Sequence, residues 1–482
     1  MSDTTVADPN TLYDKSDTTF VAVAAMLVFL MVPGIGLLYS GLSRRKHALS
    51  LLWCSLCVLG LCAIQWYFLG YSLAFSHNTK GSGFIGSLQM GAGHNMLFWG
   101  KPSVVSTVPD VLFAMFQLMF ACVTTIILCG GSCERARLFP LMVFMFIWLT
   151  VVYCPIACWY WNPTGWLAEL GVLDYAGGGP VHMSSGAGAL AYALCLGKRN
   201  DPLTQKGMPK YKPHSVTSVV LGTVFIWFAW FGFNPGSAGA ATIRAWYSFY
   251  NTNLCAAVCS ITWLFIDYVR FRKWTTVGLC SGAISGLVVI TPAAGFVPLQ
   301  YSFVMGIIGA FVCNFGMDLK NLLRIDDGLD VFSMHGLGGL SGAVMTGLFT
   351  HKDINALSGA DAAPIAGGWL NHHYVQLGYQ IAGACATLAW SFVITVILLT
   401  VMNYIPFLKI RLSEEEEELG VDAAEIGEFT YEEGAMYIPE PVRSKRSVQQ
   451  PEPMSAIDDH IVTDSSHSDI VNNNNNEKPV VA

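Results

Sequence analysis

The chain of 482 residues is 53% hydrophobic and only 12% charged, with a formal net charge of −7 at pH 7. A soluble domain usually carries about 25% charged residues, so this composition excludes an ordinary soluble protein and indicates one that crosses a lipid bilayer repeatedly. The negative balance comes largely from the C-terminal region, and we predict no nucleic-acid partner, no cofactor and no metal site.

Eleven apolar segments follow one another along the chain. A helix that spans a bilayer needs roughly 20 apolar residues, and the eighth and ninth segments are short for this. The predicted fold class is an all-α polytopic membrane protein with eleven transmembrane helices, at 20–42, 48–75, 110–131, 138–160, 180–197, 215–234, 252–269, 276–291, 301–316, 331–350 and 375–403.

Lysine and arginine fix the orientation of these segments. When the loops are assigned to alternate sides, 17 of these residues fall on one side and 5 on the other. Positive charge marks the cytoplasmic side, so the N-terminus is predicted outside and the C-terminus inside. The predicted parts are an extracellular tail (1–19), a transmembrane domain (20–404), a cytoplasmic regulatory segment (405–433) and a disordered tail (434–482).

Two histidines suggest an internal repeat. His182 lies in the fifth segment and His335 in the tenth, and an acidic stretch precedes each of them. Five spans followed by five matching spans must be inverted relative to each other, and such repeats place a substrate path at their interface. We therefore predict repeats at about 20–197 and 215–350, with the eleventh helix at about 375–403 added.

The segments around His182 and His335 contain no charged residue. A titratable ring in hydrocarbon is costly and by default faces a path or a partner. Either ring alone is also compatible with a packing role, but two at matching places favour function. A neutral pair can share a hydrogen bond and hold a small polar molecule or pass a proton.

Aromatic and polar residues lie at the predicted outer ends of the spans. Trp161 can attract a small cation through its ring face, and the Ser237 hydroxyl can accept a hydrogen bond. Phe120 and Phe233 can close a path to water. The alternatives are an interfacial anchor for Trp161 and packing for the phenylalanines, while Asp174 fits a helix cap as well as a binding group.

These residues resemble the ammonium transporter, methylammonium permease and Rhesus superfamily, most closely its fungal permease branch. The resemblance covers about residues 20–431. It rests on VPGIGLLYSG at 32–41, FQLMF at 116–120, ERAR at 134–137, DYAGGGPVH at 174–182, WFGFNPGS at 230–237 and DVFSMHG at 330–336.

The resemblance implies a role for each candidate. An outer ammonium site would contain Trp161, Ser237, Phe116 and Asp174, and a stacked gate would contain Phe120 and Phe233. His182 and His335 match the paired histidines of the family, and Trp230 matches a pore-wall residue. Homotrimers with one pore per subunit, ammonium and methylammonium as substrates, and a multi-pass location in the plasma membrane are implied as well.

The branch and the tail carry two further expectations. Histidine rather than glutamate at position 182 resembles the high-affinity sensor type of fungal permease, a transceptor in nitrogen-limited filamentous growth. The run from Glu414 to Glu418, together with Gly427 and Glu428, resembles a docking segment that regulates the inner mouth. A kinase acting on the distal tail is predicted at Ser465 and Ser466.

The predicted function is uptake of ammonium by recruitment of the cation, removal of its proton and passage of ammonia past the histidines. The proton would travel separately. An electroneutral ammonia channel and an ammonium receptor without transport remain alternatives. An enzyme is not predicted, because the chain contains no nucleophile motif or histidine ligand motif.

Overall fold

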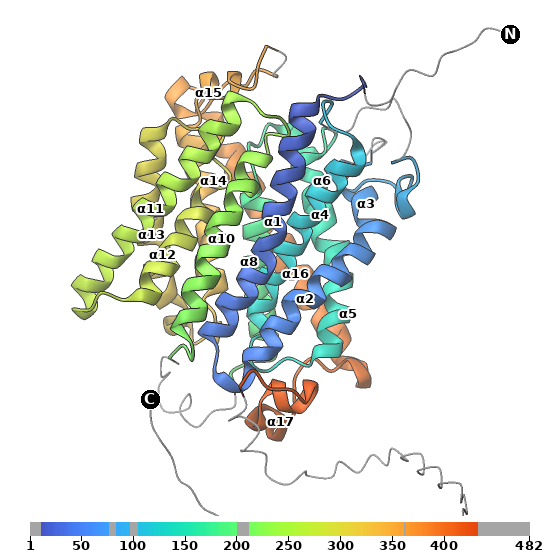
Figure 1. The fold of residues 1–482 in the computed structure, drawn as a ribbon, viewed down its shortest axis with the longest axis vertical. Helices are drawn as coiled ribbons and strands as arrows, with labels where there is room; N and C mark the ends of the chain where they lie inside the picture. Colours follow the sequence, from blue (N-terminus) through green and yellow to red (C-terminus); the bar gives the residue numbers. More distant parts are fainter. Residues whose placement is uncertain (1–10, 77–82, 97–104, 200–211, 361–362, 432–482) are drawn as a thin grey trace, which may run out of the picture. The chain divides into compact units, whose positions relative to one another are not determined.

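The computed structural model describes residues 11–76, 83–96, 105–199, 212–360 and 363–431 (Figure 1). Regular structure in these ranges is entirely helical, apart from an isolated bridge between Ala136 and Arg411. The predicted all-α fold is therefore confirmed. The predicted disordered tail, with Ser465 and Ser466, lies outside the described residues.

The helices follow the chain in two sets. Up to residue 199 they are α1 (Lys15–Leu42), η2 (Arg45–His47), α2 (Ala48–Gln65), η3 (Trp66–Gly70), α3 (Tyr71–Phe75), η4 (Gly91–Gly93), α4 (Asp110–Cys129), η5 (Gly130–Ser132), α5 (Leu138–Trp148), η6 (Leu149–Tyr153), α6 (Cys154–Trp161), α7 (Trp166–Leu170), η7 (Gly178–Met183) and α8 (Ser184–Leu196). From residue 212 they are α10 (Val216–Gly236), α11 (Ile243–Phe271), α12 (Thr276–Ile290), α13 (Leu299–Leu323), η8 (Phe332–Leu337), α14 (Gly338–Phe349), α15 (Lys352–Ala356), η9 (Trp369–Asn371), α16 (Val375–Tyr404), η10 (Pro406–Leu408), α17 (Glu414–Leu419) and η11 (Asp422–Ile426).

Each of the eleven predicted segments coincides with a helix of the described chain, although α11 begins at Ile243, before the predicted boundary. Eight helices of this part of the chain are long and apolar enough to cross a membrane. The shorter helices α8, α12 and α14 pack inside the same bundle. Their crossing of the membrane, and hence the count of eleven, stays a prediction, as does the orientation.

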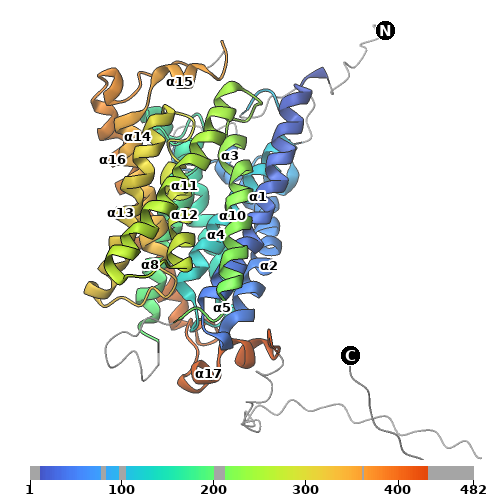
Figure 2. The ribbon, with the colours of Figure 1, turned by 60° about the vertical axis from the view of Figure 1, so that its left-hand side comes forward.

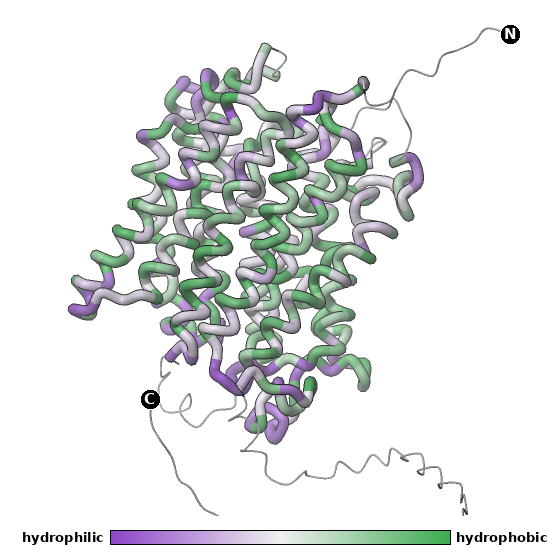
Figure 3. Tube along the Cα trace, in the orientation of Figure 1, coloured by the Kyte–Doolittle hydropathy of each residue, from purple (hydrophilic) through white to green (hydrophobic). Residues whose placement is uncertain are grey.

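Helices far apart in the sequence lie side by side. The two views place α1 along α10 and α11 beside α13, and α8 packs against α16 (Figures 1 and 2). Apolar residues fill the middle of these helices, while hydrophilic residues gather at the two ends of the bundle (Figure 3). This distribution is expected when a lipid bilayer surrounds the apolar middle.

Small residues let the helices approach closely. A Cβ added at Gly222 in α10 would lie 2.5 Å from the backbone nitrogen of Leu38 in α1. At Gly186 in α8 an added Cβ would collide with the backbone nitrogen of Gly336 in η8. Backbones that touch in this way have no room for a side chain, so the second contact fixes where the two histidine-bearing helices cross.

Both histidines lie in π-helical turns. His182 belongs to η7 and His335 to η8, and each turn runs directly into an α-helix. A π-helical turn widens the backbone and is frequently found at functional sites. The same local structure at both positions agrees with the predicted repeat, whose inversion stays a prediction.

Candidate functional site

The two histidine rings meet in the interior of the bundle. Nδ1 of His335 lies 3.3 Å from Nδ1 of His182, and the side chains are 5% and 0% exposed. One nitrogen donates and the other accepts when a single hydrogen lies between them. Nε2 of His182 is buried and has no hydrogen-bond partner among the described residues. That nitrogen is available to a small polar guest.

Aromatic rings continue outward from this pair. The Trp230 ring stacks on His182, with centroids 5.3 Å apart. The Phe233 ring lies 6.1 Å from His182 and stacks on Phe120 at 4.0 Å. The structure thus brings the predicted gate residues, Phe120 and Phe233, into direct ring contact next to the histidines. A hydroxyl that sequence reasoning missed, Thr291 in the loop after α12, accepts from Nε1 of Trp230 at 3.1 Å and fixes that ring.

The predicted recruitment residues contact Phe120 and Phe233, the predicted gate residues. Trp161 meets Phe120 edge to face at 5.8 Å, and Phe116 contacts Phe120 at 4.9 Å. The Ser237 hydroxyl donates to the carbonyl oxygen of Phe233 at 2.8 Å. Because its proton is used in this bond, the Ser237 oxygen presents lone pairs, which suit a donor such as ammonium.

Asp174 caps the start of the first histidine-bearing helix. Its carboxylate accepts the backbone N–H groups of Gly177, Gly178 and Gly179 at 2.7, 2.8 and 2.6 Å. Gly177 has a φ of +114°, and a Cβ there would lie 3.2 Å from the Trp161 ring. Of the two roles left open by the sequence, the structure favours the cap. Through these bonds Asp174 fixes the backbone that leads to His182.

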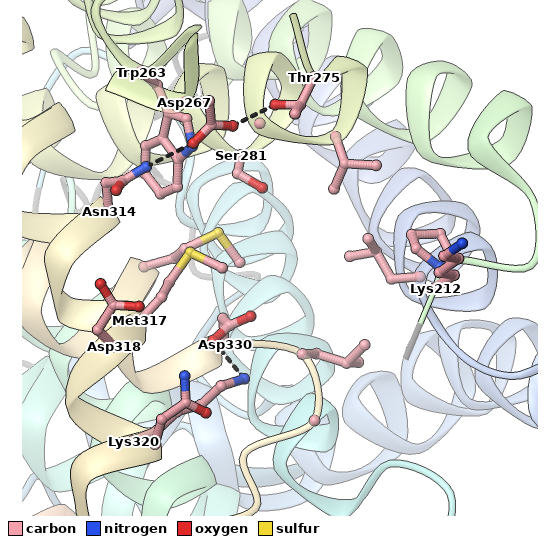
Figure 4. A pocket seen from close by; sticks show the side chains of 18 of the residues that line it. Lys212, Trp263, Asp267, Thr275, Ser281, Asn314, Met317, Asp318, Lys320 and Asp330 are labelled. Atoms are coloured by element: carbon pink, nitrogen blue, oxygen red, sulfur yellow. Dashed lines mark hydrogen bonds and ion pairs between the residues drawn. The ribbon is translucent and has the colours of Figure 1, made fainter. Parts of the chain in front are cut away.

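A cavity of about 500 Å³ is lined by residues of α11, α12 and α13 and of the loop before η8 (Figure 4). Its lining reaches Met334, the neighbour of His335. Charged residues of the wall are paired with one another: Lys320 with Asp330 at 2.5 Å, and Arg270 with Asp318 at 2.5 Å. The carboxylate of Asp267 accepts from Thr275 and Asn314 (Figure 4).

Buried charges cluster beside this cavity. Glu134 pairs with Arg44 at 2.6 Å and with Arg199 at 2.9 Å, and Arg199 also pairs with Asp326 at 2.7 Å. Burial alone would raise the pKa of Glu134, but the neighbouring side chains His47, Arg199 and Arg44 lower it to about 2. The ERAR motif contained Glu134, yet no local pattern in the sequence paired it with Arg199 or Asp326.

The C-terminal segment docks on the same side of the bundle. Lys46 donates to the carbonyl oxygens of Glu417 and Glu418, at 3.0 and 2.6 Å. Glu417 pairs with Arg411 at 2.8 Å. The Asp422 carboxylate accepts the N–H groups of Leu49 and Ser50 at 2.9 and 2.8 Å, and so caps the start of α2.

The side chains of the predicted residues in this segment make fewer contacts with the bundle than those of their neighbours. Glu414 begins α17 and is exposed, as is Glu428, while Glu418 contributes its carbonyl group. Gly427 ends η11 with a φ of +76°. The predicted run from Glu414 to Glu418 includes Glu417, whose carbonyl group binds Lys46. Sequence reasoning did not single out Asp422, whose partners Leu49 and Ser50 are distant in the chain.

Comparisons with known proteins agree with this geometry. Residues 19–431 match the model of the Ammonium Transporter Family. The chain is 64% identical to ammonium transporter MEP2 of Saccharomyces cerevisiae, over 94% of this chain and 91% of the relative. It is 48% identical to ammonium transporter 1 of Schizosaccharomyces pombe, over 89% of this chain and 85% of the relative.

Solved structures give the same answer. The crystal structure of Saccharomyces cerevisiae Mep2 covers 91% of this chain and 96% of its own, with a TM-score of 0.84. Candida albicans Mep2, 54% identical, covers 91% of this chain and 96% of its own, with a TM-score of 0.82. The relatives are named as transporters, in agreement with the prediction that the chain is not an enzyme. This chain belongs to the Ammonium Transporter Family.

Proposed function

We propose that the chain takes up ammonium across the plasma membrane, and that ammonia and its proton pass the centre separately. The contact between His182 and His335, buried directly below Trp230 and Phe233, is the observation that carries this mechanism. Family membership and the names of the relatives support ammonium as the substrate.

Recruitment would take place at Trp161, Ser237 and Phe116. Cation–π attraction contributes about 0.5–2 kcal/mol per ring, and the lone pairs of Ser237 add a hydrogen-bond acceptor. Such contacts are weak enough that the cation can leave again. The Asp174 carboxylate is occupied by three backbone N–H groups, so it would tune the site without holding the ion.

The gate would then separate the cation from the dry centre. Phe120 and Phe233 are both fully buried and stacked. Moving an ion into an apolar interior costs far more than moving a neutral molecule of the same size. Ammonia formed by loss of a proton near the gate avoids this cost and can hydrogen-bond to the open Nε2 of His182.

The histidine pair would carry the proton. Two neutral imidazoles in contact can accept a proton at one nitrogen and release one at another. Met334 and the cavity beside it offer a route onward from His335 toward the predicted cytoplasmic side. Net transfer of one ammonium charge would result without an ion crossing the apolar centre.

Current and uptake measured on purified protein in lipid vesicles test this mechanism. We expect an ammonium-dependent current in proportion to uptake, and losses of about 100-fold or more for His182→Ala and His335→Ala, as is typical when a proton-transfer group is removed. His372→Ala, an exposed histidine in a loop, is the matched control. Uptake without current would favour the electroneutral channel, and binding without uptake would favour the receptor.

Four further proposals rest on the family and on the docked tail. We propose a homotrimer in the lipid bilayer, with one path per subunit, and methylammonium as a second substrate. We also propose that the docked segment and a kinase acting on the distal tail regulate uptake, and that the chain serves as an ammonium sensor. Truncation after Tyr431 should leave uptake intact and abolish its regulation; unchanged regulation would rule out a role for the distal tail.

A further inference from the structure

Arg199 and Asp326 lie next to the two histidine-bearing helices. Arg199 follows the end of α8, which continues from the π-turn of His182. Asp326 precedes η8, which holds His335. A contact between these two residues therefore joins one end of each helix.

The contact is bidentate and buried. The guanidinium of Arg199 donates to both oxygens of Asp326, at 2.7 and 2.9 Å, and the backbone N–H of Arg199 adds a third bond at 2.9 Å. The side chains are 7% and 4% exposed. Parallel bonds between guanidinium and carboxylate fix direction as well as distance, so this pair holds its two segments in a defined orientation.

Arg135 bridges the same two segments a second time. Its guanidinium donates to the carbonyl oxygens of Gly197 at 3.0 Å and Asp326 at 2.7 Å, and the whole residue is 0% exposed. Gly197 ends α8, and Asp326 belongs to the loop before η8. The two bridges together prevent the segments from moving apart independently.

The helices touch again at the glycine crossing described above. Gly186 lies one turn beyond His182, and Gly336 directly follows His335. On the far side, a Cβ at Gly339 would lie 2.8 Å from the carbonyl oxygen of Gly178 and 3.2 Å from the Cβ of His182. A rotation about this crossing would change the contact between the imidazole rings. The bonds of Arg199 and Arg135 to Asp326 oppose such a rotation.

We propose that Arg199 and Asp326 are positioning residues that hold His182 and His335 at hydrogen-bond distance. The inference rests on the proposed function, since it assigns regulation of geometry to the same histidine pair. Neither residue belongs to the ring contacts at the outer site, where affinity would be set. Loss of the Arg199–Asp326 pair should therefore lower the maximal rate of uptake and leave the half-saturation concentration for ammonium nearly unchanged.

The test compares uptake by purified, reconstituted full-length variants. Arg199→Gln and Asp326→Asn should each lower the maximal rate about tenfold, since small misplacements of reacting groups cost rates of this order, with the half-saturation concentration changed less than twofold. Arg199→Lys, which keeps the charge, should recover part of the rate. The double variant should lose no more than either single variant, because the two residues act as one unit.

Arg270→Gln is the matched control. It removes another charge pair, between α11 and α13, that joins neither histidine-bearing helix. An equal loss of maximal uptake rate in Arg270→Gln, or a full rate in Arg199→Gln, would contradict the proposal. These outcomes are separate from failure of the proposed function, which the His335→Ala variant reports on its own.

A spectroscopic measurement distinguishes positioning from stability. In protein labelled with ¹⁵N-histidine, the signals that disappear in His182→Ala and His335→Ala belong to the pair. We expect Arg199→Gln to shift those signals away from their hydrogen-bonded positions and to leave the signal of the exposed loop residue His372 unchanged. Unshifted signals together with slower uptake would show that Arg199 and Asp326 do not position the histidine pair, and would overturn the proposal.

Discussion

The two ends of the histidine-bearing helices are held by different chemistry. At the predicted outer end, the Asp174 carboxylate accepts three backbone N–H groups. At the other end, paired charges bind one another: Arg199 joins Asp326 and Glu134. The Asp174 carboxylate accepts from backbone amides, while Asp326 and Glu134 accept from guanidinium groups as well as from backbone amides.

The difference follows from what each end must tolerate. A cation that arrives from outside would be trapped by an unoccupied carboxylate, because close opposite charges attract strongly where water is scarce. Amide groups occupy Asp174 without placing a competing cation near the site. At the inner end no weak binding is needed, and bidentate pairs supply rigidity. Under the proposed function, the outer end is suited to exchange and the inner end to positioning.

The strongest way to break this arrangement is to act between the two ends, at the glycine crossing. Gly186→Ala would place a methyl group against the backbone nitrogen of Gly336, and backbone cannot move aside like a flexible side chain. Overpacking of this kind typically costs about 1–3 kcal/mol or more. We expect uptake per molecule at the membrane to fall about 100-fold, because the histidine rings lose their contact.

The control for this variant is a glycine with open space. Gly378→Ala in α16 adds the same methyl group where no atom lies within 4 Å. It should transport normally. Comparable uptake by the two variants would mean that the crossing does not determine the path.

Removal of the Asp174 carboxylate should have the next largest effect, which we expect on thermal stability. Asp174→Ala leaves three backbone N–H groups without their acceptor, and an unmet buried donor costs about 1–3 kcal/mol. Thermal unfolding of the purified protein should shift several degrees lower, and Asp174→Asn, which keeps one acceptor oxygen, should recover part of the loss. An unchanged unfolding temperature with weaker ammonium affinity would instead assign Asp174 to direct binding.

Periodicity and composition predicted the helices, because long apolar segments leave few alternatives in a bilayer. The histidines stood out for the same reason, since their polarity contradicts their surroundings. The ring contacts of the gate and the partners of Arg199 could not be predicted this way. Arg199 is one of many cations in the predicted cytoplasmic loops, and only the folded chain brings it to Asp326, 127 residues away.

The pair of Asp326 with Arg199 also predicts a small dependence of the stability of the fold on pH. Burial alone would raise the pKa of Asp326, but the hydrogen bonds and charge of Arg199 hold it well below its usual range. A carboxyl with a lowered pKa stabilises the fold above its unfolded value of about 3.9, and this stabilisation disappears as the pH falls through the folded value. The unfolding temperature of purified wild-type protein should therefore decrease from about pH 4 downward.

Asp326→Asn should be less stable than wild type at pH 7 and should show a shallower decrease below pH 4, because it lacks the titrating group. Asp318→Asn is the matched control, because it removes the carboxyl of another ion pair, with a side chain that is 43% exposed. Asp174 has backbone N–H partners. Of these two contacts, only the one between Arg199 and Asp326 is a buried ion pair. Equal slopes for wild type and Asp326→Asn would mean that this pair contributes little to holding the inner ends together.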